Sequence, residues 1–228
     1  MSLNDWATTN DTTPGTGLEI HTEVDFPEVG DGSLAMIHTG TTSFSHTNLW
    51  PVQTLPTTGV EPAGRIRTIC RVDVHEGATP QTSYFGVTAM QSQNSLQGSG
   101  ACYALLVTSG ESLASPRLHL HRFNTGLTDG LTEASFTDIP FPGGITLGVP
   151  FTMELQWVVD VPGLGGAFLV GRTGTATDFS DLTDQIATID TSPLLTSTTQ
   201  GVVGSFKNNL AGSVKKVVFD NTTVYELI

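Results

Sequence analysis

The sequence predicts an all-β protein built as an antiparallel two-sheet β-sandwich, a jelly roll. Three observations support this fold class: apolar and polar residues alternate with a period of two, turn-forming clusters separate the alternating segments, and no strand–helix–strand spacing occurs. Threonine alone is more frequent than all charged residues together, which favours strands and turns over helices. A chain of 228 residues can fold as one such domain.

The expected strands follow one another along the chain with turns between them. Residues 18–26 form the first, with Ile20 and Val24 on the face opposite Glu19, as in a half-buried strand. Residues 65–75 repeat this design. The further strands are expected at residues 84–90, 101–108, 117–123, 151–161, 167–171, 202–206 and 214–227.

Three segments lack this alternation. Residues 1–17 are expected to form a loose N-terminal arm, and residues 39–64 a long loop or an ordered insertion. A short helix is expected around residues 179–186. Residues 18–228 then make up a single β-sandwich domain that carries the insertion at 39–64.

Charge and cysteine content restrict the function. Acidic residues outnumber basic ones 22 to 9, giving a formal charge of −13, so neither nucleic acid nor a membrane surface is an expected partner. The first 17 residues carry no basic, apolar leader, and we expect no signal peptide. A Thr-, Ser- and Gly-rich surface without a leader favours release by cell lysis, as for a virus particle. Cys70 and Cys102 lie on separate predicted strands and are expected to be buried free thiols.

Three segments resemble the concanavalin A-like lectin/glucanase superfamily, in the laminin-G-like form found in phage and bacterial surface proteins. They are residues 65–74 (RIRTICRVDV), the strand 151–159 with the following 167–172, and residues 201–228 with their FDN-x-x-V-Y-x-L pattern. The resemblance implies a jelly roll. It leaves the function open, because this fold is used by lectins, glycosidases, adhesion modules and virion parts.

The segment from Glu23 to Glu28 matches the E-x-D-x-x-E spacing of the retaining β-glucanases in this superfamily. The resemblance implies Glu23 as nucleophile, Asp25 as its helper and Glu28 as acid/base, with carboxyl groups about 5–5.5 Å apart. The motif lies unusually early in the chain, and Pro27 falls inside the strand. An acidic solvent-facing strand is the alternative interpretation, and we favour it.

Metal-binding candidates are few. His119 and His121 lie two residues apart on a predicted strand and so point the same way, as metal ligands on a β-barrel can; exposed paired histidines are the simpler interpretation. Asp220 and Asn221 resemble positions that hold a structural calcium in some relatives, although a local turn hydrogen bond explains them equally simply. We therefore predict no metal site and no cofactor, with a structural calcium as the alternative.

Two further groups bear on binding. Trp50 and Tyr84 are candidates for stacking on sugar rings, or are packing residues. Arg65, Arg67 and Arg71 form a basic stripe that either docks an acidic patch of a neighbouring copy or pairs within the molecule, with Glu19, Glu23 and Asp25 as the expected partners.

The sequence thus favours a non-enzymatic structural protein of a tailed-phage virion: a decoration, fibre or tail-associated protein. Its jelly roll would attach it to other virion proteins and to further copies of itself, and would contact a host surface glycan. The alternatives are a β-glucan-type glycoside hydrolase that uses Glu23 and Glu28, and a cellular carbohydrate-binding lectin module.

Overall fold

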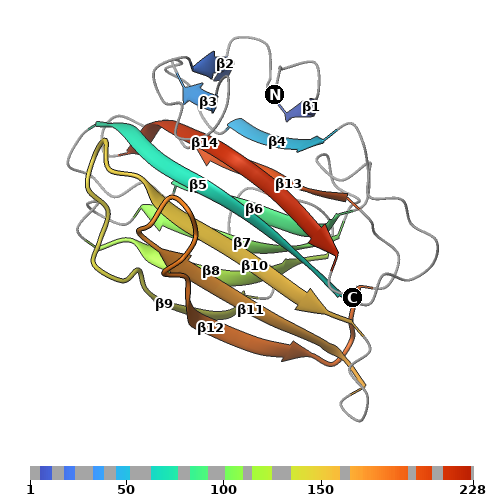
Figure 1. The fold of residues 1–228 in the computed structure, drawn as a ribbon. Coiled ribbons are helices and arrows are strands. Elements are labelled where there is room, and N and C mark those ends of the chain that lie inside the picture. Colours follow the sequence, from blue (N-terminus) through green and yellow to red (C-terminus); the bar gives the residue numbers. More distant parts are fainter. Residues whose placement is uncertain are drawn as a thin grey trace.

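The fold is a sandwich of two antiparallel seven-stranded sheets (Figure 1). The computed structural model describes residues 6–11, 18–23, 33–38, 45–51, 63–76, 83–91, 101–109, 115–124, 135–159, 165–194, 199–206 and 213–226. Sheet A contains, in spatial order, β1 (Trp6–Asp11), β4 (Ser45–Pro51), β13 (Thr199–Phe206), β6 (Ser83–Gln91), β7 (Cys102–Ser109), β8 (Arg117–Phe123) and β9 (Ser135–Pro140).

Sheet B faces the viewer in Figure 1. It contains, in spatial order, β12 (Thr183–Asp190), β11 (Ala167–Gly174), β10 (Phe151–Val158), β5 (Ala63–Glu76), β14 (Ser213–Glu226), β3 (Ser33–His38) and β2 (Leu18–Glu23). Every neighbouring pair in both sheets is antiparallel. The predicted all-β, two-sheet jelly roll is therefore confirmed, and no described residue is helical.

The main core lies between the two sheets. Period-two alternation turns every second residue of β10 inward, so Phe151, Met153, Leu155 and Trp157 are buried against side chains such as Leu105 of β7. Burial of each such side chain stabilises the fold by about 1.5–3 kcal/mol. The same alternation leaves the even-numbered residues of β10 on the outer face of sheet B, where polar side chains gather.

A second link joins the sheets at one edge. Tyr103 of β7 belongs to the main core, and its hydroxyl donates to Asp190 Oδ2 of β12 at 2.7 Å. The same carboxylate accepts from Arg122 Nη1 of β8, also at 2.7 Å. Burial raises the pKa of the Tyr103 hydroxyl, so it remains a protonated donor to Asp190. These bonds fix the end of β12 against sheet A.

Both cysteines are buried free thiols, as predicted. Cys70 lies in the core between the sheets, whereas Cys102 lies in a separate buried cluster on the outward-facing side of β7. Burial raises the pKa of the Cys70 thiol.

The structure differs from the sequence expectation in five segments, two of which are the strands β3 and β9, which the alternation does not predict. Within the expected arm, residues 6–11 form β1, and within the expected loop 39–64, residues 45–51 form β4, which pairs with both β1 and β13. The expected helix around residues 179–186 does not form; this stretch is a turn followed by β12. A β-bulge beside Arg172 shifts the register of β12, and of residues 183–187 only Ile186 is buried, so the alternation there is weak in the sequence.

Candidate functional site

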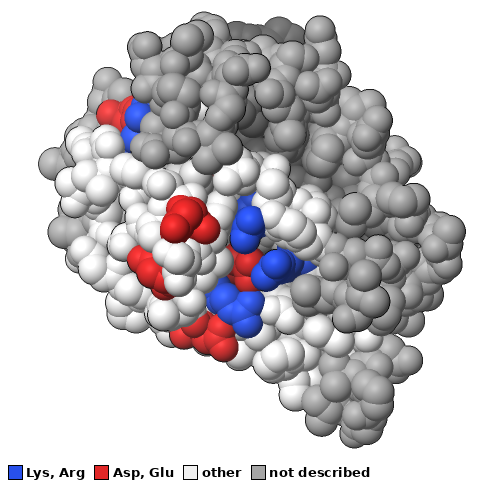
Figure 2. Space-filling model, in the orientation of Figure 1, with Lys and Arg blue, Asp and Glu red and all other residues white. Residues whose placement is uncertain are grey.

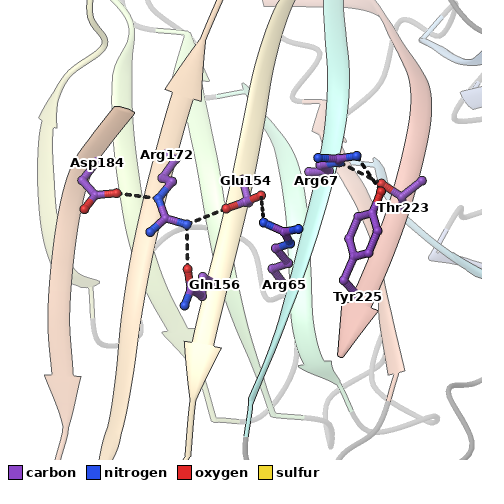
Figure 3. A network of polar contacts seen from close by, with 8 residues as sticks. All are labelled: Arg65, Arg67, Glu154, Gln156, Arg172, Asp184, Thr223 and Tyr225. Atoms are coloured by element: carbon purple, nitrogen blue, oxygen red, sulfur yellow. Dashed lines mark hydrogen bonds and ion pairs between the residues drawn. The ribbon is translucent and has the colours of Figure 1, made fainter. Parts of the chain in front are cut away.

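The candidate site is a polar cluster on the outer face of sheet B (Figure 3). Because Ile66 and Leu155 face the core, their neighbours in β5 and β10 face outward. We call this group the arginine cluster; its members are Arg65, Arg67, Glu154, Gln156, Arg172, Asp184, Thr223 and Tyr225.

Strand register brings the members together in two rows. The first row crosses five strands, from Asp184 through Arg172, Glu154 and Arg67 to Thr223, each paired with the next across the sheet. The charges along this row alternate in sign, an arrangement that stabilises cross-strand neighbours. The second row, one step along the strands, holds Gln156, Arg65 and Tyr225.

Glu154 is the buried centre of the cluster. Its side chain is only 1% exposed, and Oε1 accepts from Arg172 Nη1 at 2.6 Å. Arg65 Nη1 lies 3.7 Å from Oε2, within ion-pair distance but beyond a hydrogen bond. Two guanidinium groups therefore share one carboxylate.

Arg172 makes three hydrogen bonds through Nε and Nη1. Besides Glu154 it donates to Gln156 Oε1 at 2.6 Å and, through Nε, to Asp184. Partial burial acts to lower the pKa of Arg172, but its hydrogen bonds to Asp184 and Glu154 outweigh this and raise the pKa above its ordinary value.

Arg67 has only neutral partners among the described residues. Nη2 donates to Tyr225 Oη at 2.5 Å and Nε to Thr223 Oγ1 at 3.2 Å. The guanidinium carbon lies 4.3 Å from the ring centroid of Phe179 and 4.7 Å from that of Tyr225. Cation–π contacts thus hold Arg67 in place while leaving its charge uncompensated.

Phe179 belongs to the loop that joins β11 to β12 and lies over the outer face of sheet B. It packs with Ala35, Ile69 and Val218 in a small apolar cluster. Asp181 closes the loop by accepting the backbone N–H groups of Thr175 and Ala176, both at 2.9 Å, and the Thr175 hydroxyl at 2.7 Å. The hydrogen bond from the Thr175 side chain, followed by those from the two backbone N–H groups, lowers the pKa of Asp181.

Of the candidate catalytic motif, only the backbone of Glu23 lies in the described part of the chain. Glu23 ends β2, the edge strand of sheet B, and β3 and β14 separate it from β5. Asp25 and Glu28 lie outside the described residues. Among the described residues the arginine stripe has these partners: Glu154 and Tyr225 for Arg65, Thr223 and Tyr225 for Arg67, and Asp73 for Arg71. The side chains of the expected partners Glu19, Glu23 and Asp25 lie outside the described part of the structure.

The two aromatic candidates do not offer a described sugar-stacking surface. Tyr84 is fully buried, in a cluster with Cys102, Leu106 and Phe123, so its ring presents no face to a ligand. This corrects the expectation that it could stack on a sugar; β6 places it in the interior instead. Trp50 lies on β4, and its side chain is outside the described part of the structure.

His119 and His121 do share the outward-facing side of β8, but they are not an exposed pair. His119 Nε2 and Thr108 Oγ1 share a hydrogen bond of 2.9 Å, and His121 is fully buried with its ring 4.3 Å from that of Phe123. Burial lowers the pKa of His119, with Asp138 acting in the opposite direction. Among the described residues no three His, Cys, Asp or Glu side chains form a metal-binding group.

Asp220 serves a local turn. It is 4% exposed, and its Oδ1 accepts the backbone N–H of Asn221 at 2.8 Å. Asn221 has a positive φ of 44°, where β14 shifts register against β5. This local bond accounts for the FDN pattern.

Sequence reasoning missed Glu154, Gln156, Arg172 and Tyr225. A signal was present in β10, where Glu154 and Gln156 alternate with Met153, Leu155 and Trp157 in an otherwise apolar strand. Polar residues at alternate positions of a central strand indicate a solvent-facing side with its own chemistry.

The two packed sheets, with a polar network on the outer face of one, define a concanavalin A-like jelly roll, the fold of many glycan-binding proteins. Solved structures with this fold include the exoplasmic/lumenal domain of VIP36 in a Ca²⁺/Man-bound form (7% identity, TM-score 0.54, covering 98% of this chain and 84% of that one). The carbohydrate esterase of the Shiga toxin-encoding bacteriophage phi24B is similar at 12% identity and a TM-score of 0.52, covering 97% of this chain and 90% of the esterase.

A third similar structure is the marine PL-14 alginate lyase from Aplysia kurodai, with 7% identity and a TM-score of 0.52, covering 91% of this chain and 87% of the lyase. No protein-family model matches the sequence, and no curated protein matches it. At these identities the likeness concerns the fold.

Proposed function

We propose that this chain is a non-enzymatic glycan-binding component of a tailed-phage particle and that it binds the glycan on the outer face of sheet B. The observation that carries the proposal is the arginine cluster, which presents guanidinium, amide, hydroxyl and aromatic groups together on one face of the sandwich. Such groups hydrogen-bond to sugar hydroxyls and pack on sugar rings.

The absence of catalysis is part of this proposal. Acid/base hydrolysis of a glycoside needs one carboxyl group whose proton can be transferred at the working pH. Glu154, the buried carboxylate of the cluster, is hydrogen-bonded to Arg172 and ion-paired with Arg65, and in this proposal it holds these arginines in position.

The particle association rests on composition and on fold. The acidic, threonine-rich sequence suits an exterior surface, and a phage carbohydrate esterase has the same fold. We propose that the chain attaches to other virion proteins and to further copies of itself. Immunogold labelling of purified particles tests this directly, and labelling confined to the host cell envelope would favour the cellular lectin alternative.

Glycan binding is tested by retention on a panel of immobilised polysaccharides, with release of new reducing ends measured in parallel. We expect retention without cleavage and weaker retention by Arg67→Ala. The matched control is Arg117→Ala, which removes an exposed arginine from β8 of sheet A. Cleavage that disappears in Glu23→Gln would show that the protein is a β-glucan hydrolase instead. Full retention by Arg67→Ala would show that the glycan does not bind on the outer face of sheet B.

A further inference from the structure

The arginine cluster carries more positive than negative charge, in a chain whose net charge is −13. Three arginines, Arg65, Arg67 and Arg172, face two carboxylates, Glu154 and Asp184. Arginines are scarce in this chain, yet Figure 2 shows basic and acidic groups gathered on this face of the molecule. A local excess of guanidinium over carboxylate is a site for an anion.

Arg172 accounts for both carboxylates, since it donates to Glu154 and to Asp184. Arg65 is therefore left at the longer 3.7 Å from Glu154. Its Nε is buried and has no hydrogen-bond partner within the described ranges, while its side chain is 34% exposed. The buried Nε is out of reach of a ligand, so a ligand would contact Arg65 through the exposed part of its guanidinium group.

Arg67 adds a second charge beside Arg65. Phe179 and Tyr225 hold its guanidinium on two sides, and its hydrogen bonds go to neutral oxygens. Arg65 also lies over the Tyr225 ring, with its guanidinium carbon 4.8 Å from the ring centroid. Two guanidinium groups thus flank one aromatic residue: Arg67 has only neutral hydrogen-bond partners among the described residues, and Arg65 shares the Glu154 carboxylate with Arg172.

The surrounding groups favour a saccharide over a bare anion. Gln156, Thr223 and Tyr225 are neutral and adjoin the two arginines in the cross-strand rows. These amide and hydroxyl groups suit sugar hydroxyls, while a guanidinium fork suits a carboxylate. Repulsion by the remainder of this acidic chain acts on a nucleic acid and on a uronic-acid polymer alike, so selection of a saccharide depends on these neutral groups.

From these observations we propose that the outer face of sheet B binds an acidic polysaccharide, with a uronic-acid carboxylate seated at Arg65 and Arg67. This inference deepens the proposed glycan binding and rests on it. Arg65 supplies the open hydrogen-bonding and charged contact, Arg67 supplies a second fixed charge, and the neutral groups orient the sugar ring. Glu154 and Arg172 are positioning residues: Glu154 forms an ion pair with Arg65, and Arg172 donates a hydrogen bond to Glu154.

The test uses polygalacturonate and the same polymer in highly methyl-esterified form, which keeps the backbone and removes the charge. We expect the intact protein to bind polygalacturonate at least about tenfold more tightly in a calorimetric titration, and binding to weaken as salt is raised. Equal affinity for both polymers would overturn the acidic-ligand inference while leaving glycan binding intact. If the protein binds neither polymer and no other polysaccharide of the panel, the proposed glycan binding is itself wrong.

Variants locate the contact. Arg65→Gln should weaken polygalacturonate binding about tenfold, the loss expected for one charge-assisted hydrogen-bonded contact, whereas Arg117→Gln on sheet A should leave it unchanged. Thermal unfolding of both variants checks that they are folded. A last titration compares dextran sulfate with uncharged dextran. Tight binding of the sulfated polymer without binding of polygalacturonate would contradict a carboxylate ligand. An effect of Arg117→Gln equal to that of Arg65→Gln would contradict the location.

Discussion

At the scale of single residues, the polar face of sheet B depends on Glu154, an almost completely buried carboxylate that accepts a hydrogen bond from Arg172. We predict that Arg172→Met lowers the free energy of unfolding by about 3 kcal/mol, since it leaves Glu154 buried with only the more distant Arg65. Urea denaturation of the variant and the parent protein measures the difference.

The matched variant removes both partners. Replacing Glu154 and Arg172 together by leucine should recover most of the lost stability, because the buried carboxylate is removed with its partner and only the partly exposed Arg65 loses an ion pair. A double variant that is less stable than Arg172→Met would show that the pair itself, and not the orphaned carboxylate, dominates the energy.

His119 sets a second prediction at this scale. Its pKa is lowered by burial, so the unfolded chain takes up a proton at a higher pH than the folded one does. The folded state is therefore penalised as pH falls through the ordinary value of 6.5 toward the depressed value. Urea midpoints measured from pH 8 to pH 5 should decline, and decline less in His119→Gln.

The pH range of this effect differs from the range in which the carboxylates titrate. The pKa of Asp181 is also lowered, but from an ordinary value of 3.8, so its hydrogen bonds to the β11–β12 loop are lost only at more acidic pH. An unchanged slope in His119→Gln between pH 7 and pH 5 would assign the decline to other groups.

The sequence could predict only those residues of the site that lie on the same strand. Arg65 and Arg67 stand out as a basic stripe on one strand, because alternation places them on one face. Glu154, Arg172 and Tyr225 lie on three other strands, and only the order β11-β10-β5-β14 and its register bring them together. Neither the order nor the register is encoded in any short segment.

At the scale of elements, the β11–β12 loop holds an apolar side chain in an unfavourable backbone conformation. Phe179 has a φ of 63° and is buried against sheet B. Truncating it loses the packing in either Phe179→Ala or Phe179→Gly. A positive φ costs a residue with a Cβ about 1 kcal/mol relative to glycine. We therefore predict that Phe179→Gly is about 1 kcal/mol more stable than Phe179→Ala, in equilibrium urea denaturation, the reverse of the order in a regular strand.

Two glycines should respond differently to alanine. A Cβ at Gly86 of β6 would overlap the backbone carbonyl of Leu105, whereas a Cβ at Gly171 of β11 would overlap the side chains of Leu105 and Ile186. Side chains can change rotamer, but a strand paired on both sides cannot move. We predict that Gly171→Ala destabilises by about 1–3 kcal/mol and Gly86→Ala by more. Thermal denaturation of the two variants measures the order, and a smaller loss in Gly86→Ala would contradict it.

Prediction of the elements succeeds where the pattern is strong. The long strand β5 and the strands β10 and β14 bury one face and alternate clearly. β1 and β12 are edge strands, and β4 is a short strand without a strict apolar alternation, so their sequences predict an arm, a helix and a loop. Their strand conformation comes from pairing with a neighbour, a tertiary effect that local patterns do not contain.

At the scale of the whole molecule, the two thiols report on the integrity of the sandwich. Cys70 is buried between the sheets and Cys102 on the opposite side of sheet A, each at most 1% exposed. We predict that neither reacts with a thiol reagent in the native protein and that both react together in denaturant, at the rate of global unfolding. Titration with a chromogenic disulfide reagent measures this. Rapid reaction of one thiol in the native state would reveal a local opening.

The position of the last two strands has a consequence for synthesis. β13 lies between β4 and β6, and β14 lies between β3 and β5, so each sheet has a central gap until residues 199–226 are present. The two halves of each sheet cannot close around these strands while residues 199–226 are still inside the ribosome. Since almost all contacts made by β13 and β14 span much of the sequence, the sandwich should fold slowly and only once these residues have emerged, with unpaired strand edges that depend on chaperones for protection in the meantime.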